Sequence, residues 1–126
     1  MEKFAWVCLA GALGTGTRYL VTLGAQARWG PDWPIGTFLV NVVGCFLIAL
    51  LSQVALQKSS FSPDLRVILA TGFVGGLTTY SSFSYETMRF ARLGQTSAAL
   101  VYFLATTLVC FLALFLGDAL ARATAS

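Results

Sequence analysis

GFVGGLTTYSSFSYE occupies residues 72–86, inside a longer run, Val67–Tyr85, that contains no charged residue. As a helix rising about 1.5 Å per residue, that run would nearly cross a hydrocarbon core of about 30 Å. Its centre is unsuited to a lipid-facing helix, because glycines weaken the helix and hydroxyl groups are unfavourable against lipid. The residues concerned are Gly72, Gly75, Gly76, Thr78, Thr79, Ser81, Ser82 and Ser84. Non-helical backbone at membrane depth must be buried in protein or line a polar cavity. We therefore expect a helix that is broken in mid-membrane.

The composition is that of an all-α integral membrane protein. The chain has 126 residues, of which 57% are hydrophobic and 10% charged, and its mean hydropathy is +0.78. A water-soluble domain of this length would carry more charge. The net charge of +3 comes from dispersed residues, so neither a nucleic-acid-binding patch nor a polybasic lipid anchor is expected, and the partners are lipid rather than nucleic acid.

Four apolar segments are each long enough to span a membrane. They are Phe4–Ala27, Trp33–Gln57, Val67–Phe90 and Thr96–Leu120, separated by short polar breaks that contain Gly or Pro. Residues 1–126 are thus expected to form a single domain of four transmembrane helices, with the third one broken. We interpret the first segment as a span rather than a cleaved signal, because Arg18 interrupts it and no clear cleavage site follows.

The basic residues do not favour one orientation. If the four segments alternate in direction, four basic residues fall on each side of the membrane: Lys3, Lys58, Arg66 and Arg122 against Arg18, Arg28, Arg89 and Arg92. Since lysine and arginine bias sets topology, a tie predicts only a weak preference, so that the chain could insert in both orientations. The alternative is that the tie is arbitrary, because Arg18 and Arg66 each lie within a turn or two of an apolar run. Two oppositely inserted copies could form an antiparallel homodimer, which would supply the inverted symmetry that this chain lacks as an internal repeat.

The first two segments contain polar residues with two open interpretations each. Asn41, on the same face as Thr37, must hydrogen-bond either another helix or a permeating species. Arg18 could extend to the membrane interface or raise the anion concentration at a pore mouth. Gly11 and Gly14 are expected to permit close helix packing.

A broken helix presents two electrostatic ends. Carbonyls released near residues 75–78 would suit a small cation, whereas N–H groups near Thr79 or Tyr80 would suit an anion. Ser81, Ser82 and Ser84 add hydroxyl donors. Tyr80 and Phe83 could present the positive edges of their rings to an anion, although aromatic residues at this spacing are also typical of a packed core.

No titratable group lies in the middle of a span, which favours passive conduction over proton-coupled transport. Glu86 lies near the far end of the third segment, where a pair with Arg89 is expected. There is no histidine and no nucleophile with an adjacent base, so the chain is not expected to be an enzyme. Tyr102 or Thr106 could add a hydroxyl group to the same polar face, but a satisfied packing role is expected for each. The three cysteines are expected to be packing residues, and Asp118 and Arg122 a surface pair.

Three motifs, GALGTGTRY (residues 11–19), PIGTFLVNVVGCF (residues 34–46) and GFVGGLTTYSSFSYE, resemble the Fluc (CrcB) fluoride channels of bacteria and archaea. They occur in the family's order and cover the first three segments. The resemblance implies a passive fluoride channel of the bacterial inner membrane that gives fluoride resistance. It also implies an antiparallel dual-topology dimer with two pores and a structural sodium ion at the dimer interface.

The resemblance also implies roles for individual residues. Sodium would be bound by the backbone carbonyls of Gly75 and Thr78. The fluoride pore would be lined by Asn41, Tyr80, Phe83, Thr37, Ser81, Ser82 and Ser84, and its mouth by Arg18 and Glu86. Tyr80 departs from the family, which usually has Phe here, so the added hydroxyl could change fluoride affinity or rate.

Two other classes of membrane protein are alternatives. A small multidrug-type antiporter is also a short four-helix dimer, but it would be expected to carry a glutamate within its first span, and residues 4–17 contain none. A non-conducting membrane scaffold would not need the hydroxyl residues of the third segment.

Overall fold

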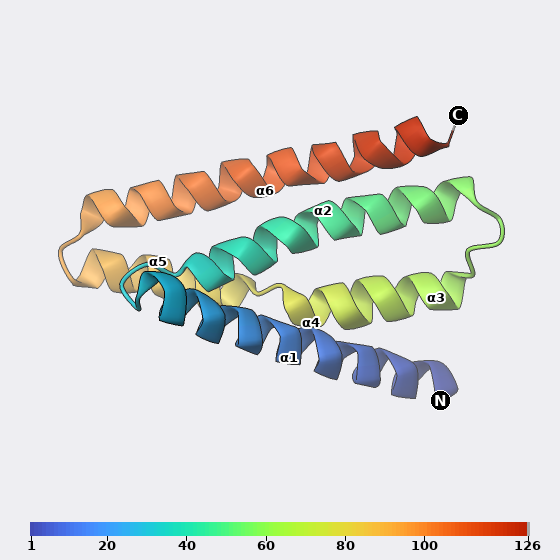
Figure 1. Ribbon diagram of the computed structural model, residues 1–126, viewed down its shortest axis with the longest axis horizontal. Helices are drawn as coiled ribbons and strands as arrows, with labels where there is room; N and C mark the ends of the chain where they lie inside the picture. The colour runs from blue at the N-terminus through green and yellow to red at the C-terminus, as the bar shows by residue number, and fades with distance from the viewer. Residues whose placement is uncertain (126) are drawn as a thin grey trace.

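The computed structural model describes residues 1–125, and every regular element in that range is helical (Figure 1). The two long N-terminal helices are α1 (Glu2–Trp29) and α2 (Ile35–Gln57). The third segment consists of α3 (Pro63–Val67), the π-helix η1 (Ile68–Val74), α4 (Gly75–Leu77) and α5 (Tyr80–Arg92), and α6 (Thr96–Thr124) follows. Both termini lie at the same end of the bundle, and the expected all-helical fold is confirmed.

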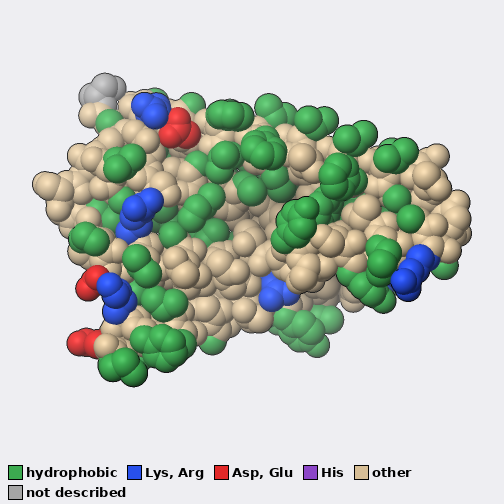
Figure 2. Space-filling model, turned by 180° about the vertical axis from the view of Figure 1, so that it is seen from behind, with side chains coloured by type: hydrophobic (Ala, Val, Ile, Leu, Met, Phe, Trp, Pro, Cys, Tyr) green, Lys and Arg blue, Asp and Glu red, His purple; other side chains and the backbone are tan. Residues whose placement is uncertain are grey.

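The outside of the bundle is apolar along its length. Helices α2 and α6 are long and apolar enough to cross a membrane. Large apolar side chains are exposed on several helices, including Leu13, Leu108 and Phe115, which are 62%, 63% and 67% exposed. Figure 2 shows apolar side chains spread over one face, with the charged ones mostly toward the two ends. Such a surface is suited to contact with lipid rather than water.

The third segment is interrupted where the glycines and hydroxyl residues predicted a break. Thr78 and Thr79 are extended, with φ/ψ of −89°/157° and −154°/112°. The segment begins conventionally, because Ser62 accepts a hydrogen bond from the Leu65 amide and Pro63 occupies the first turn. The π-helical turns before the break were not predicted, since nothing in the residue pattern distinguishes them from an α-helix.

Glycines allow α1 to pack directly against the first half of the third segment. A Cβ atom on Gly14 would collide with the Phe73 carbonyl oxygen, and one on Gly76 would collide with the Gly11 carbonyl oxygen. The packing role expected for Gly14 is thus confirmed, whereas a Cβ on Gly11 would make only an ordinary contact, 3.6 Å from the Gly72 carbonyl oxygen. Gly76 weakens the helix and also makes room for α1.

Aromatic residues join α5 to α6 at the other end of the bundle. Phe83, Phe90 and Tyr102 form a buried cluster, against which Phe38 of α2 packs. The cluster fixes the position of α5 relative to α6 and α2.

The expected pair of Asp118 and Arg122 on α6 is also present, with Arg122 Nε 2.8 Å from Asp118 Oδ2.

Candidate functional site

The side chain of Asn41 binds the backbone at the helix break. Its Oδ1 atom accepts a hydrogen bond from the Thr79 amide at 2.8 Å, and its Nδ2 atom donates to the Thr79 carbonyl oxygen at 3.2 Å. One amide side chain thereby satisfies both peptide groups of an extended residue that has left the helix. Asn41 was expected to hydrogen-bond either another helix or a permeating species. The structure shows the first of these, a contact with the backbone of the third segment.

Thr79 also caps the second half of the segment. Its Oγ1 accepts from the Ser82 amide at 3.2 Å, which is the usual N-cap contact, and lies 3.2 Å from both the Ser81 and Ser82 hydroxyl oxygens. Three hydroxyl groups therefore gather at the positive end of α5. This role of Thr79 was not assigned from the sequence, although its place before a helix start is a recognisable signal.

Arg18 binds the other side of the break. Its Nε atom donates to the Gly76 carbonyl oxygen at 3.1 Å, and the Thr15 hydroxyl lies 3.5 Å from the same oxygen. The guanidinium thus compensates the negative end of the first half-helix. Neither interpretation of Arg18 included this contact.

The place of Arg18 at the break also changes the count of basic residues at the two ends of the bundle. Four basic residues lie near one end, and only Arg28, Arg89 and Arg92 lie near the other.

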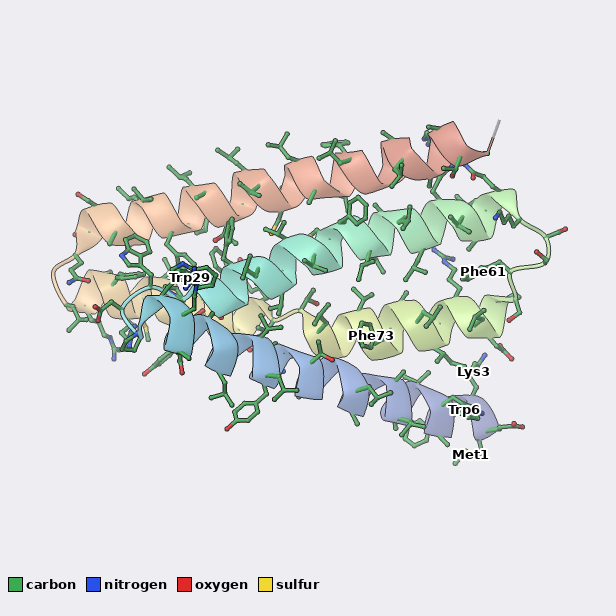
Figure 3. The ribbon with its side chains drawn as sticks, viewed as in Figure 1. Met1, Lys3, Trp6, Trp29, Phe61 and Phe73 are labelled. Carbon is green, nitrogen blue, oxygen red and sulfur yellow. The ribbon has the colours of Figure 1, made fainter. Side chains whose placement is uncertain are left out.

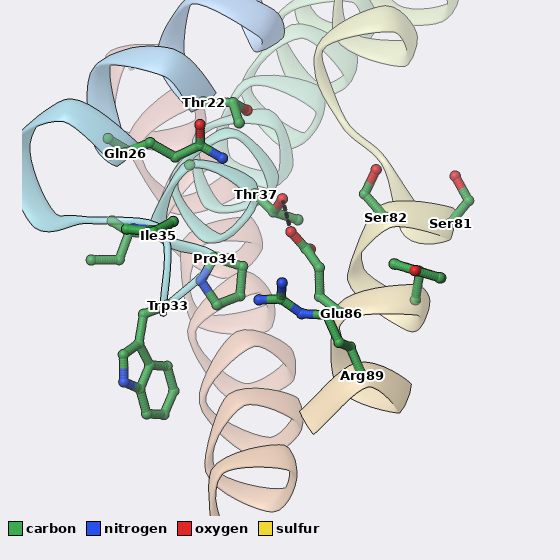
Figure 4. A pocket seen from close by; sticks show the side chains of 14 residues that line it. Thr22, Gln26, Trp33, Pro34, Ile35, Thr37, Ser81, Ser82, Glu86 and Arg89 are labelled. Atoms are coloured by element: carbon green, nitrogen blue, oxygen red, sulfur yellow. Dashed lines mark hydrogen bonds between the residues drawn. The ribbon is translucent and has the colours of Figure 1, made fainter. Parts of the chain in front are cut away.

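A first pocket, of about 380 Å³, lies between the end of α1, the start of α2 and α5 (Figure 4). Thr37, Ser81, Ser82 and Glu86 all line it. The Glu86 carboxylate accepts hydrogen bonds from the Thr37 hydroxyl and the Tyr102 phenol, both at 3.0 Å. The ion pair expected between Glu86 and Arg89 is not formed, although Arg89 lines the same pocket and acts on the carboxylate through its charge.

A second pocket, of about 430 Å³, opens on the other side of the break. Asn41, Gly75, Thr78, Tyr80 and Phe83 line it. The Phe83 ring is buried and the Tyr80 ring is 77% exposed, with their centroids 5.8 Å apart in an edge-on arrangement. The two predicted aromatic residues thus lie together at one pocket.

The predicted pore residues therefore divide between two neighbouring pockets. Thr37 of the first and Asn41 of the second are one turn apart on α2. Ser84 lines neither pocket and is exposed, because it lies between the two faces of α5 that do. Arg18 also lies outside both linings.

Thr106 of α6 was expected to be a satisfied packing residue, and this was wrong. Its side chain is only 4% exposed, and its Oγ1 atom has no hydrogen-bond partner within residues 1–125. It lines the second pocket. The other interpretation of Thr106, a hydroxyl group beside the polar residues of the break, fits this place in the pocket. The missing hydrogen-bond partner could not be predicted, since it depends on which helix packs beside Thr106.

The break leaves two carbonyl groups without the partners of a continuous helix. In such a helix the Gly75 carbonyl would accept from the Thr79 amide, and the Thr78 carbonyl from the Ser82 amide. Those amides instead donate to Asn41 Oδ1 and Thr79 Oγ1. These are the two carbonyls predicted to bind sodium, and they are free of these helical hydrogen bonds.

Comparison with known proteins identifies the family of this chain. The family model described as "CrcB-like protein, Camphor Resistance (CrcB)" matches residues 5–118. The chain belongs to the CrcB family. CrcB relatives named fluoride-specific ion channel FluC match nearly the whole chain. Those of Anaeromyxobacter dehalogenans and Sorangium cellulosum are 49% and 43% identical over 122 residues, covering 97% of this chain and 97% and 96% of the relatives. The FluC of Rhizobium meliloti is 44% identical and covers 98% of both chains. These CrcB relatives carry the names of ion channels, which agrees with the expectation that this chain is not an enzyme.

Proposed function

We propose that this chain is a fluoride-selective channel that lets fluoride leave the cytoplasm passively and so gives fluoride resistance. The observation that carries the proposal is the break at residues 78–79, where helix ends, an amide and hydroxyl groups converge between two pockets. The choice of fluoride as the ion is supported by the near-full-length likeness to channels with that name.

The pathway must replace the water around a small anion. An isolated ion in a low-dielectric medium costs tens of kcal/mol, so donors have to act at successive positions. We infer that fluoride passes from the hydroxyl groups of Thr37, Ser81 and Ser82 to the ring edge of Phe83 and the amide of Asn41. In the first pocket the Glu86 carboxylate accepts the hydrogen bond of the Thr37 hydroxyl, so it competes with fluoride for this donor. That competition keeps the ion from being bound too tightly to move on.

We further propose that α1 and the third segment cross the membrane together with α2 and α6, as one domain of residues 1–126. Trp6 and Trp29 lie toward opposite ends of α1 (Figure 3), and they are 51% and 57% exposed. At 1.5 Å per residue they are about 35 Å apart along the helix, close to the spacing of the two bilayer interfaces that tryptophan prefers. In a bacterium this bilayer would be the inner membrane.

The functional unit that we propose is an antiparallel dimer with two pores. The exposed Tyr80 ring and the exposed Gly75 backbone border the second pocket, where lipid would be an unsuitable neighbour for released carbonyl groups. A second copy running in the opposite direction would cover this face. The revised count of four basic residues against three is still a weak bias, which supports insertion in both orientations.

We also propose that sodium binds at the dimer interface as a structural ion. Sodium is a hard cation and prefers oxygen ligands, and the carbonyl oxygens of Gly75 and Thr78 fit that preference because the break frees them from these helical bonds. When bound, the ion would neutralise carbonyl dipoles that point into the interface. The chain's own residues set the site: Asn41 and Thr79 take the amides that would otherwise cover these oxygens.

Purified protein in liposomes tests the function against its rivals. Vesicles loaded with fluoride, chloride or a cationic drug are followed with ion-selective electrodes or drug fluorescence. We expect rapid fluoride efflux, far slower chloride efflux and no drug exchange. Drug exchange driven by a proton gradient would indicate an antiporter, and efflux equal to that of protein-free vesicles would indicate a scaffold.

A further inference from the structure

Two of the three cysteines meet in the wall of the second pocket. Cys45 on α2 and Cys110 on α6 both line it, and the two thiols are close enough to interact electrostatically. Both side chains are partly buried, whereas Cys8 is exposed on α1. The pair was expected to be ordinary packing residues, but the fold brings two thiols from distant parts of the chain to one pocket.

The pair lies one turn beyond residues that hold or border the helix break. Cys45 follows Asn41 by about one turn of α2, and Cys110 follows Thr106 by about one turn of α6, which is about 6 Å along each helix. Phe83, Thr78 and Thr106 line the same pocket. A group bound between the two sulfurs would therefore occupy the space that an ion passing Asn41 has to use.

We propose that Cys45 and Cys110 form a two-coordinate site for a soft, thiophilic metal cation, and that its occupation closes the second pocket. Two sulfur ligands suit such cations, since soft metals select thiolates. Zinc does not fit, because structural zinc sites use four ligands and no group of three or more Cys, His, Asp or Glu residues is found in the described part of the chain.

The binding step needs no oxidant. With mercuric ion, both thiols release their protons to water, two S–Hg bonds form, and the product is a neutral S–Hg–S bridge between α2 and α6. The bridge places a large atom in the pocket one turn from Asn41 and links the two helices. The metal site itself does not depend on what the channel carries, but the block of fluoride flux rests on the function proposed above.

Binding is tested by thiol footprinting of the full-length protein in detergent. One equivalent of Hg²⁺ per chain is added, a monothiol competitor removes singly bound metal, and a maleimide then labels the remaining thiols for mass spectrometry. We expect Cys45 and Cys110 to be protected together while Cys8 is labelled. Methylmercury, which binds one thiol only, should give no protection after the competitor. Cys45→Ser should abolish protection of Cys110, and Cys110→Ser that of Cys45. Protection of either cysteine in the absence of the other, or equal protection of Cys8, would overturn the site.

The block is tested separately in liposomes, where efflux without metal first establishes whether the chain carries fluoride. Hg²⁺ with the competitor present should lower fluoride efflux at least tenfold in the wild type and in Cys8→Ser. Efflux by Cys45→Ser and Cys110→Ser should stay within twofold of each variant's own rate without metal. A protected thiol pair with unchanged wild-type efflux would refute closure of the pocket. No efflux before metal is added would refute the proposed function and leave the footprint as the test of the site.

Discussion

At the scale of single residues, the break depends on side chains that bind backbone groups from a distance. Asn41 contacts Thr79 and Arg18 contacts Gly76, across 38 and 58 residues of sequence. The sequence predicted that Asn41 needs a partner, because an amide inside a span cannot remain unpaired. It could not identify the partner of Arg18, since a guanidinium reaches many positions and the packing of α1 on α4 selects one.

Phe83→Ile should reduce fluoride efflux at least about tenfold, which corresponds to about 1.4 kcal/mol of lost stabilisation of the ion. Isoleucine fills much of the same space but has no positive ring edge. Phe90→Ile is the matched control, because Phe90 belongs to the same buried cluster and lines neither pocket. Liposome efflux and thermal unfolding in detergent should show similar destabilisation of both variants but slow efflux only for Phe83→Ile. Equal rates for the two would remove the ring from the pathway.

Thr106→Val should raise the stability of the protein by about 1 kcal/mol or more, because it removes a buried hydroxyl without a hydrogen bond and keeps the side chain's shape. Thr37→Val is the contrast: Thr37 is equally buried but is bonded to Glu86, so this change should destabilise. Thermal unfolding in detergent checks both, and a destabilised Thr106→Val would contradict the orphaned hydroxyl.

At the scale of elements, the third segment combines a break that could be predicted with a geometry that could not. Three glycines followed by five hydroxyl residues in an uncharged run indicate that the helix is interrupted. The π-helix before the break and the division of α5 residues between two pockets depend on the neighbouring helices. For the same reason the sequence grouped Ser84 with Ser81 and Ser82, although only the latter two line the first pocket.

Gly44→Ala should destabilise the protein by about 1–3 kcal/mol, the usual cost of overpacking. The new Cβ would collide with Cγ2 of Thr78 at the break, while its next nearest neighbours are at ordinary distances of 3.5 and 3.7 Å. Thr78→Ser removes the colliding methyl group and keeps the hydroxyl that donates to Val74.

The double variant Gly44→Ala/Thr78→Ser should therefore recover most of the stability and fluoride efflux lost by Gly44→Ala. Gly16→Ala is the control for adding a methyl group, because a Cβ there meets nothing within 4 Å. Unfolding temperature and efflux are the measurements. If Thr78→Ser gave no rescue, the contact of α2 with the break would not be the one described.

At the scale of the whole molecule, the bundle has an apolar exterior, few charges and both termini at one end. The composition and the count of four apolar segments predicted this much. The proposal of a partner subunit could be made only from the balance of charges and the family resemblance, because the surface that such a subunit would cover is formed by residues from several segments. The position of Arg18 shows how sensitive such a balance is to one residue.

Orientation variants test the antiparallel dimer. Arg28→Gln/Arg92→Gln leaves four basic residues near one end against Arg89, and Lys3→Gln/Lys58→Gln/Arg66→Gln leaves Arg122 against three. Each variant should insert in a single orientation and lose fluoride resistance when expressed alone in a fluoride-sensitive bacterium. Expressed together, they should restore it. Resistance from either variant alone would contradict the need for two orientations.

The most direct test of the pathway compares fluoride efflux of wild-type protein and Asn41→Asp in liposomes with equal amounts of folded protein. Aspartate keeps the acceptor for the Thr79 amide but loses the donor to the Thr79 carbonyl and places negative charge beside the break. Fluoride efflux should be rapid for the wild type and at least about tenfold slower for Asn41→Asp. Equal efflux from the two proteins would contradict an anion pathway through the break.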